Sequence, residues 1–247
     1  MTLAIKQLEL GRLISQLENG EISFHNLKER FSQPKQQTFV LGVTGSPGVG
    51  KSTLLNLMIS EYRRNGETVA VIAVDPTSVR TGGALLGDRI RMQSNAVDEG
   101  VFIRSMATRG HLGGLSARTR ETAELLKLAG FDIIIIETVG VGQTEVEVVE
   151  VADMVVAVTT PAQGDEIQVM KAGIYEIADI IVLNKSDYKG AEAVFMDLSR
   201  LATTISSPGW RIPVLKTVGT EREGIAELMD KLMEFQKTLR GNHEGQI

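Results

Sequence analysis

The chain has 247 residues, of which 43% are hydrophobic and 23% are charged, a composition that is ordinary for a globular protein and that excludes disordered and low-complexity classes. Lysine and arginine number 26 against 31 acidic residues, a net charge of −5, so we expect no nucleic-acid partner. The absence of cysteine excludes a disulfide framework and a thiolate nucleophile, and only three histidines remain for metal binding. The N-terminal sequence suits neither a signal peptide nor a membrane span, so we expect a cytoplasmic protein without a membrane partner.

In chain order, we expect an N-terminal helical appendage with its linker at residues 1–37 and a main domain at 38–247. Apolar residues at helical spacing predict a first helix across residues 8–17 and a short second one at 23–30. Strands and helices then alternate, with strands at 39–43, 69–74, 133–136, 154–158, 180–183 and near 214, and helices at 51–65, 115–128, 191–204 and 225–239. Because the strands are apolar throughout, we predict an α/β fold with a mostly parallel central sheet and helices on both faces.

Residues 45–52 fit the pattern G-x-x-x-x-G-K-[ST] between an apolar strand and a helix, which is the context of a phosphate-binding loop, whereas a plain glycine-rich turn is the alternative. Inward-facing backbone N–H groups and the helix N-terminus would form a cradle for a triphosphate. We expect Lys51 to neutralise the β and γ phosphates, Ser52 to bind Mg²⁺, and Thr53 to lie near the α phosphate. The pattern predicts a P-loop NTPase, and its candidate nucleotide-binding residues here are Gly45, Ser46, Pro47, Gly48, Val49, Gly50, Lys51, Ser52 and Thr53.

An N-K-x-D pattern, formed by Asn184, Lys185 and Asp187, follows the predicted strand 180–183. A carboxylate at the edge of the base can accept hydrogen bonds from N1–H and the 2-amino group of guanine, whereas adenine lacks these donors. We therefore predict GTP, with Asp187 at the base edge, the stem of Lys185 across the ring face, and Asn184 bracing the loops. The backbone N–H groups of Val218 and Gly219 are candidates to meet the guanine carbonyl. The alternative is a polar turn in which Asp187 caps the next segment.

Acidic residues lie at the carboxyl ends of predicted strands or in the first long loop, where ligands of open α/β sheets bind. Glu137 can hold a Mg²⁺-bound water while the N–H of Gly140 meets the γ phosphate, with a solvated strand end as the alternative. Asp75 and Asp88 are further acids for Mg²⁺, or else they cap turns. Arg80, Arg104 and Arg109 are either charge stabilisers for the transition state or surface or structural arginines. The candidate catalytic set is Lys51, Asp75 and Glu137, and the candidate metal set is Ser52, Asp75, Asp88 and Glu137.

Several longer segments point to one family: residues 42–53 around the phosphate loop, then VDPTS at 74–78, GGALLGDR at 82–89, RSMATRG at 104–110, ETVGVGQ at 137–143 and KAG at 171–173. With these segments the chain resembles the MeaB/ArgK GTPases, which are metallochaperones of methylmalonyl-CoA mutase. The resemblance implies a GTPase that gates delivery of adenosylcobalamin to an acyl-CoA mutase, protects or reactivates that enzyme, and is stimulated by it. Adenosylcobalamin then belongs to the partner enzyme, and an adenosyltransferase is a further candidate partner.

The resemblance also implies an additional switch at residues 163–171 that responds to the mutase, with Gln168 and Lys171 as its polar contacts. Family members usually carry a longer C-terminal helical arm that makes the dimer. Here only a short segment, ending with residues 241–247, follows the last predicted helix. Whether the chain forms the homodimer of the family is therefore left open.

Three other functions are alternatives. A nickel-delivery GTPase of the HypB or UreG kind shares the loop layout, but such proteins bind metal through cysteine and histidine clusters, which this sequence lacks. A small-molecule kinase is disfavoured by the N-K-x-D pattern. A non-catalytic, nucleotide-gated interaction module differs from a GTPase only in releasing no phosphate.

Overall fold

The computed structural model describes residues 3–29, 31, 38–75, 98–107, 114–138, 150–162, 172–206 and 210–244. The chain forms two compact units. The first consists of Met1–Thr44 and Tyr62–Val155, and the second of Gly45–Glu61 and Val156–Ile247.

The first unit contains a parallel sheet in the order β3-β2-β4-β1. The strands are β1 (Phe39–Thr44), β2 (Val69–Asp75), β3 (Val101–Ala107) and β4 (Ile133–Thr138). Every residue of β1 and β4 is buried, as we expect of parallel strands covered on both faces.

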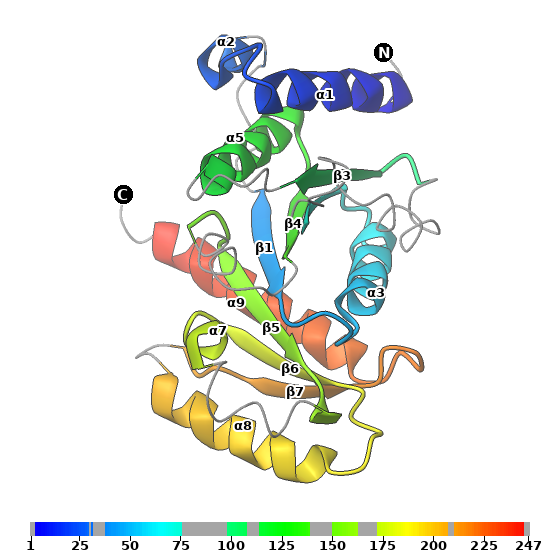
Figure 1. The fold of residues 1–247 in the computed structure, drawn as a ribbon, viewed down its shortest axis with the longest axis vertical. Coiled ribbons are helices and arrows are strands. Elements are labelled where there is room, and N and C mark those ends of the chain that lie inside the picture. The colour runs from blue at the N-terminus through cyan, green and yellow to red at the C-terminus, as the bar shows by residue number, and fades with distance from the viewer. Residues whose placement is uncertain are drawn as a thin grey trace. The chain divides into compact units, whose positions relative to one another are not determined.

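Three helices of the first unit are α1 (Leu3–Glu18), α2 (Phe24–Lys28) and α5 (Gly114–Ala129). Figure 1 shows α1 and α2 lying over α5, which in turn contacts β2 and β4. Ser23 caps α2, because its side chain accepts a hydrogen bond from the backbone N–H of Asn26. The helix predicted across residues 8–17 is confirmed as part of α1. Leu10, Ile14 and Leu17 of its apolar stripe are buried in the same hydrophobic cluster as residues of the sheet, whereas Leu8 is 63% exposed.

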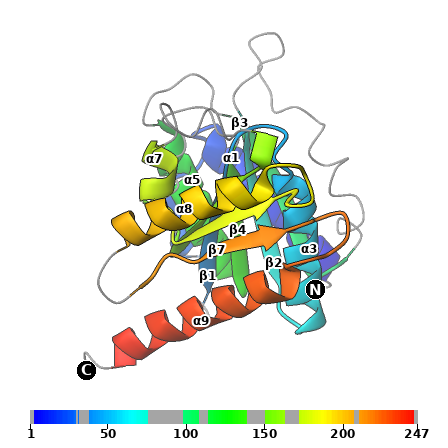
Figure 2. The same ribbon diagram turned by 90° about the horizontal axis from the view of Figure 1, so that it is seen from below.

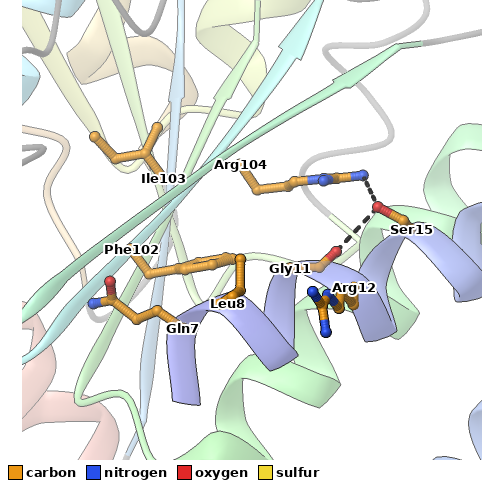
Figure 3. A pocket seen from close by; sticks show the side chains of 8 residues that line it. All are labelled: Gln7, Leu8, Gly11, Arg12, Ser15, Phe102, Ile103 and Arg104. Carbon is orange, nitrogen blue, oxygen red and sulfur yellow. Dashed lines mark hydrogen bonds between the residues drawn. The ribbon is translucent and has the colours of Figure 1, made fainter. Parts of the chain in front are cut away.

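Polar contacts fix α1 along β3 (Figure 3). The Gln7 amide donates hydrogen bonds to the carbonyls of Glu99 and Val101, at 2.8 and 3.2 Å. From β3, the Arg104 guanidinium donates to Ser15 Oγ at 3.1 Å and forms an ion pair with Glu18. Arg104 therefore has a structural role in the first unit. A cavity of about 290 Å³ lies between the two elements, lined by Gln7, Leu8, Gly11, Arg12, Ser15, Phe102, Ile103 and Arg104.

The second unit contains a parallel sheet in the order β5-β6-β7. The strands are β5 (Met154–Thr159), which begins in the first unit, β6 (Ile180–Asn184) and β7 (Val214–Thr217). The helices are α3 (Lys51–Arg64), which ends in the first unit, α7 (Ala172–Glu176), α8 (Ala191–Ile205) and α9 (Ile225–Glu244). Figure 2 shows α8 and α9 on opposite sides of β7. Helices therefore cover both faces of this sheet.

The predicted α/β fold with parallel strands is confirmed. Two elements differ from the expectation, because β3 and α7 lie where the sequence pattern indicated connections. Within the part of the chain that the structure describes, no helix is both long and apolar enough to cross a membrane.

Candidate nucleotide-binding site

The phosphate-loop segment 45–50 connects β1 to α3, and its glycines have backbone conformations that other residues rarely adopt. Gly45, Gly48 and Gly50 have φ angles of 144°, 80° and 96°. A Cβ atom on Gly45 would lie 2.2 Å from the Val158 carbonyl oxygen, and one on Gly50 would lie 2.3 Å from Asn184 Nδ2. These positions require glycine because neighbouring atoms occupy the space that a side chain would need.

Lys51 begins α3 and is only 6% exposed. Its ammonium group donates hydrogen bonds to the carbonyl oxygens of Gly45, at 2.6 Å, and Ser46, at 3.1 Å. The charge is therefore held within the curve of the loop, one residue after Gly50 and at the positive end of the helix dipole. An anion bound in the loop would meet both the ammonium group and the positive end of the helix dipole.

Asn184, the last residue of β6, connects three segments of the second unit. Its side-chain amide is 2% exposed and donates to the carbonyl oxygen of Val49 at 2.8 Å. Its Oδ1 accepts from Thr217 Oγ1 at 3.0 Å and from the backbone N–H of Gly219 at 3.2 Å. The phosphate loop, the end of β6 and the loop after β7 are thus joined by one buried side chain.

Lys185 crosses from the N-K-x-D turn to the phosphate loop. It has a φ of 57°, an uncommon value for a residue with a side chain, and its ammonium donates to the Gly48 carbonyl oxygen at 2.9 Å. The next residue, Ser186, is held in place because its N–H and its hydroxyl both donate to the Thr217 carbonyl oxygen, at 3.1 and 3.2 Å. Asp187 follows on this fixed turn, and its side chain is exposed.

The loop after β7 places Val218 and Gly219 close to the start of α3. Both residues are buried. Val218 exchanges backbone hydrogen bonds with Glu223, and Gly224 closes the loop with a φ of 74°. A Cβ on Gly219 would lie 3.2 Å from the Thr53 Cγ2 atom at the start of α3. Residues near 50, 185 and 218, far apart in sequence, therefore converge on one site within the second unit.

Two of the candidate acids lie at the carboxyl ends of strands in the first unit. Asp75 is the last residue of β2. Glu137 is the penultimate residue of β4 and is 6% exposed, and it lies opposite Val43 of β1 in the parallel register. The phosphate loop begins two residues beyond Val43 in the chain. The remaining candidates, Arg80, Asp88, Arg109, Gly140, Gln168 and Lys171, lie outside the described residues.

Two residues of this site were not expected from the sequence. Thr217 donates its hydroxyl to Asn184, a contact that depends on the register between β6 and β7. Tyr188, the residue after Asp187, carries an exposed aromatic ring 5.9 Å from the Lys185 ammonium, a distance measured to the ring centroid.

Comparison with known proteins agrees with this geometry. The family model for the methylmalonyl-CoA mutase-associated GTPase MeaB matches residues 10–246. A relative from Pyrococcus abyssi, named as a GTPase, is 51% identical over 93% of this chain and 72% of its own length. GTPase ArgK of Escherichia coli is 41% identical over 82% of this chain and 62% of its own length. The mouse protein named Methylmalonic aciduria type A homolog, mitochondrial, is 39% identical, over 88% of this chain and 54% of its own length.

Solved structures agree as well. The crystal structure of an LAO/AO transport system kinase matches with a TM-score of 0.75 at 30% identity, covering 96% of this chain and 72% of that one. HypB from Helicobacter pylori in complex with nickel matches with a TM-score of 0.61 at 20% identity, over 87% of this chain and 94% of that one, which is a likeness of fold alone. The fold and the relatives together define a P-loop GTPase. The chain belongs to the MeaB family of GTPases, as the resemblance predicted.

Proposed function

We propose that this GTPase is a chaperone of an adenosylcobalamin-dependent acyl-CoA mutase of the methylmalonyl-CoA mutase type, which gates cofactor delivery and protects or reactivates the mutase. The observation that carries the proposal is the match of residues 10–246 to a family described as mutase-associated. The name of the mouse relative, which refers to methylmalonic aciduria, supports it. This chain spans 54% of the length of that relative.

In this proposal the second unit binds the nucleotide. The loop 45–53 holds the phosphates, and the Lys51 ammonium exchanges its contacts with loop carbonyls for β- and γ-phosphate oxygens. Asp187 reads the base edge, the stem of Lys185 lies against the ring face, and the backbone of Val218 and Gly219 meets the guanine carbonyl. Support comes from the Asn184 hydrogen bonds, which join the phosphate loop, the end of β6 and the loop after β7.

Mg²⁺ is the metal that the available donors fit. Ser52 offers a hydroxyl, and Asp75, Asp88 and Glu137 offer carboxylates, which are the hard oxygen ligands that Mg²⁺ prefers. The carboxylate of Glu137 is buried, a placement that favours a nearby cation because an ionised group loses its hydration on burial. When bound, Mg²⁺ would neutralise charge on the β and γ phosphates.

The reaction is in-line attack of water on the γ phosphate, without a covalent intermediate. Lys51 and the loop N–H groups stabilise the charge spread over the transferred group, Glu137 orients a water, and the Gly140 N–H meets the γ phosphate. Slow intrinsic turnover is expected, because no glutamine directly follows Gly140 to place the attacking water. Gln168 and Lys171 are proposed as polar contacts of a switch that responds to the mutase.

The partner enzyme, not this chain, would hold adenosylcobalamin, and an adenosyltransferase is a second candidate partner. A homodimer remains a candidate assembly. For the nickel-delivery alternative, the likeness to HypB at 20% identity supports the fold only, and no residue pattern of this chain favours it.

The test is phosphate release from GTP and from ATP in the presence of Mg²⁺, with and without the acyl-CoA mutase encoded nearest to this chain. We expect slow release from GTP only, accelerated by the mutase. Release from GTP that no cognate mutase changes would contradict the chaperone function while leaving the GTPase intact. Lys51→Ala is the control, because it should abolish both the basal and the stimulated release.

A further inference from the structure

The turn that carries the N-K-x-D residues ends at Tyr188. The Tyr188 backbone N–H donates to the Lys185 carbonyl oxygen at 3.1 Å, which closes the turn, and Ser186 within it is tied twice to Thr217. With Asn184 bonded to the phosphate loop at the start of the turn, the backbone on both sides of Lys185 is held in place. The long side chain of Lys185 is the part of this turn with most remaining freedom.

The side chain of Tyr188 lies where it can limit that freedom. It is 51% exposed, so packing in the core is not its main role. The Lys185 ammonium lies 5.9 Å from the centroid of its ring and 2.9 Å from the Gly48 carbonyl oxygen. A cation within about 6 Å of an aromatic ring is attracted by the charge distribution of the ring. Tyr188 and Gly48 therefore hold the same ammonium group.

We infer that Tyr188 is a positioning residue for the nucleotide: its ring keeps Lys185 extended towards the phosphate loop, so that the lysine stem is in place before the base binds. This inference rests on the proposed guanine site. A side chain that is already ordered loses less conformational entropy on binding, and the bound state is favoured accordingly. The ring acts through Lys185 and does not read the base edge, which is the role proposed for Asp187.

If Tyr188 positions Lys185, its ring should contribute to the affinity for nucleotides. Loss of the ring should weaken GDP and GTP binding alike, because both nucleotides present the same base to Lys185. The expected size is about two- to five-fold, which corresponds to an exposed cation–π contact. The preference for GTP over ATP should stay as it is, since Asp187 is intact.

The experiment measures dissociation of a fluorescent GDP analogue from the full chain, chased with excess GDP in the presence of Mg²⁺. Tyr188→Leu removes the ring and keeps an apolar side chain, and we expect two- to five-fold faster dissociation. Tyr188→Phe keeps the ring and should restore the wild-type rate. Met196→Ala is the matched control, because Met196 is also an exposed apolar residue of the second unit, at 50%. Thermal unfolding of each variant checks that it is folded.

A double-mutant cycle decides whether the ring acts through Lys185. In a Lys185→Met background, which keeps the stem and removes the charge, Tyr188→Leu should change the rate no further. The inference is overturned if Tyr188→Leu dissociates GDP at the wild-type rate, or if its effect is equally large in the Lys185→Met background. If Lys185→Met and Asp187→Asn both bind GDP as tightly as the wild type, the guanine site itself is wrong and the role of Tyr188 with it.

Discussion

Two glycines of the phosphate loop differ in what an added side chain would meet. Gly48 has a φ of 80° with open space around its Cβ position, whereas a Cβ on Gly50 would lie 2.3 Å from Asn184 Nδ2. Gly50→Ala should therefore displace Asn184 and break its hydrogen bond to Val49, costing about 1–3 kcal/mol or about 5- to 150-fold in GDP affinity. Isothermal titration with GDP measures this loss.

Gly48→Ala is the matched variant for that experiment. Its backbone strain is similar, at about 1–2 kcal/mol, but no neighbouring atom is displaced. We expect the loss of affinity for Gly48→Ala to be clearly smaller. Equal losses for the two variants would show that backbone strain alone, and not the position of Asn184, controls the loop.

A second prediction concerns the choice of base. Asp187→Asn exchanges a carboxylate, which accepts from two guanine donors, for an amide that donates one hydrogen bond and accepts another. GTP affinity should fall by about 10- to 100-fold, the value of a hydrogen bond to a charged group. Xanthosine triphosphate, which presents a carbonyl in place of the 2-amino group, should bind better to the variant than to the wild type.

Competition binding with GTP, ATP and xanthosine triphosphate measures these changes. If the variant keeps the wild-type order of the three nucleotides, Asp187 does not face the base, and its role is that of a turn residue.

At the scale of residues, the site residues that could be predicted from the sequence are those that belong to short motifs. Lys51 and Asn184 can be recognised because their spacing from glycines or from an aspartate is local. The hydrogen bond from Thr217 to Asn184 spans 33 positions, and its existence depends on the register between β6 and β7. A single sequence contains no signal for such a register, so this contact could be found only in the structure.

At the scale of elements, the contacts between α1 and β3 account for features of both sequences. The apolar stripe of α1 could be predicted from helical spacing, but what it packs against could not. The strand β3 was hidden because Arg104 and Ser105 interrupt its apolar run. Arg104 is tolerated there because Glu18 and Ser15 of α1 bind its guanidinium.

This pairing gives a stability prediction. The side chains of Arg104 and Glu18 are only 19% and 15% exposed, so removal of one partner leaves a poorly hydrated charge. Glu18→Ala should lower the free energy of unfolding by about 2–3 kcal/mol, somewhat less than for a fully buried pair. Chemical denaturation followed by circular dichroism measures the change.

Its control is the double variant Glu18→Met with Arg104→Met, which replaces both charges with apolar side chains and should recover most of the lost stability. A double variant as unstable as Glu18→Ala would mean that α1 contributes to stability through shape at this position and not through charge.

At the scale of the whole molecule, the alternation of strands and helices was enough to predict the α/β class, because apolar strands of this length need cover on both faces. The division into two compact units was not predictable, since two of the three points where the chain passes between them lie inside the continuous elements α3 and β5, and the third lies directly at the end of β1. Sequence marks of a domain boundary, such as polar linkers, do not occur inside a helix or a strand.

The stability of the whole chain should also depend on pH through one ion pair of the first unit. The Arg63 guanidinium donates two hydrogen bonds to the Asp98 carboxylate, each 3.0 Å long, and the Gly100 N–H donates a third at 2.7 Å. The hydrogen bonds from Arg63 and then from Gly100 hold the pKa of Asp98 below its ordinary value of 3.8. Burial opposes this only weakly, since 38% of the side chain is exposed.

Because the pKa is lower in the folded state, the unfolded chain binds more protons as the pH falls towards 3.8, and the contribution of Asp98 to stability is lost on further acidification. Asp98→Asn should therefore destabilise the protein by about 1 kcal/mol at neutral pH, a value discounted for solvent exposure, and by almost nothing once Asp98 is protonated in both states. Urea denaturation of both proteins from pH 7 downwards measures this difference. Asp197→Asn, whose ion pair with Arg200 is 63% and 73% exposed, should show no such trend. If the difference in free energy of unfolding between the two proteins is the same in acid as at pH 7, the effect of Asp98→Asn comes from the shape of the side chain. A contribution from the charge of the carboxylate would disappear on protonation.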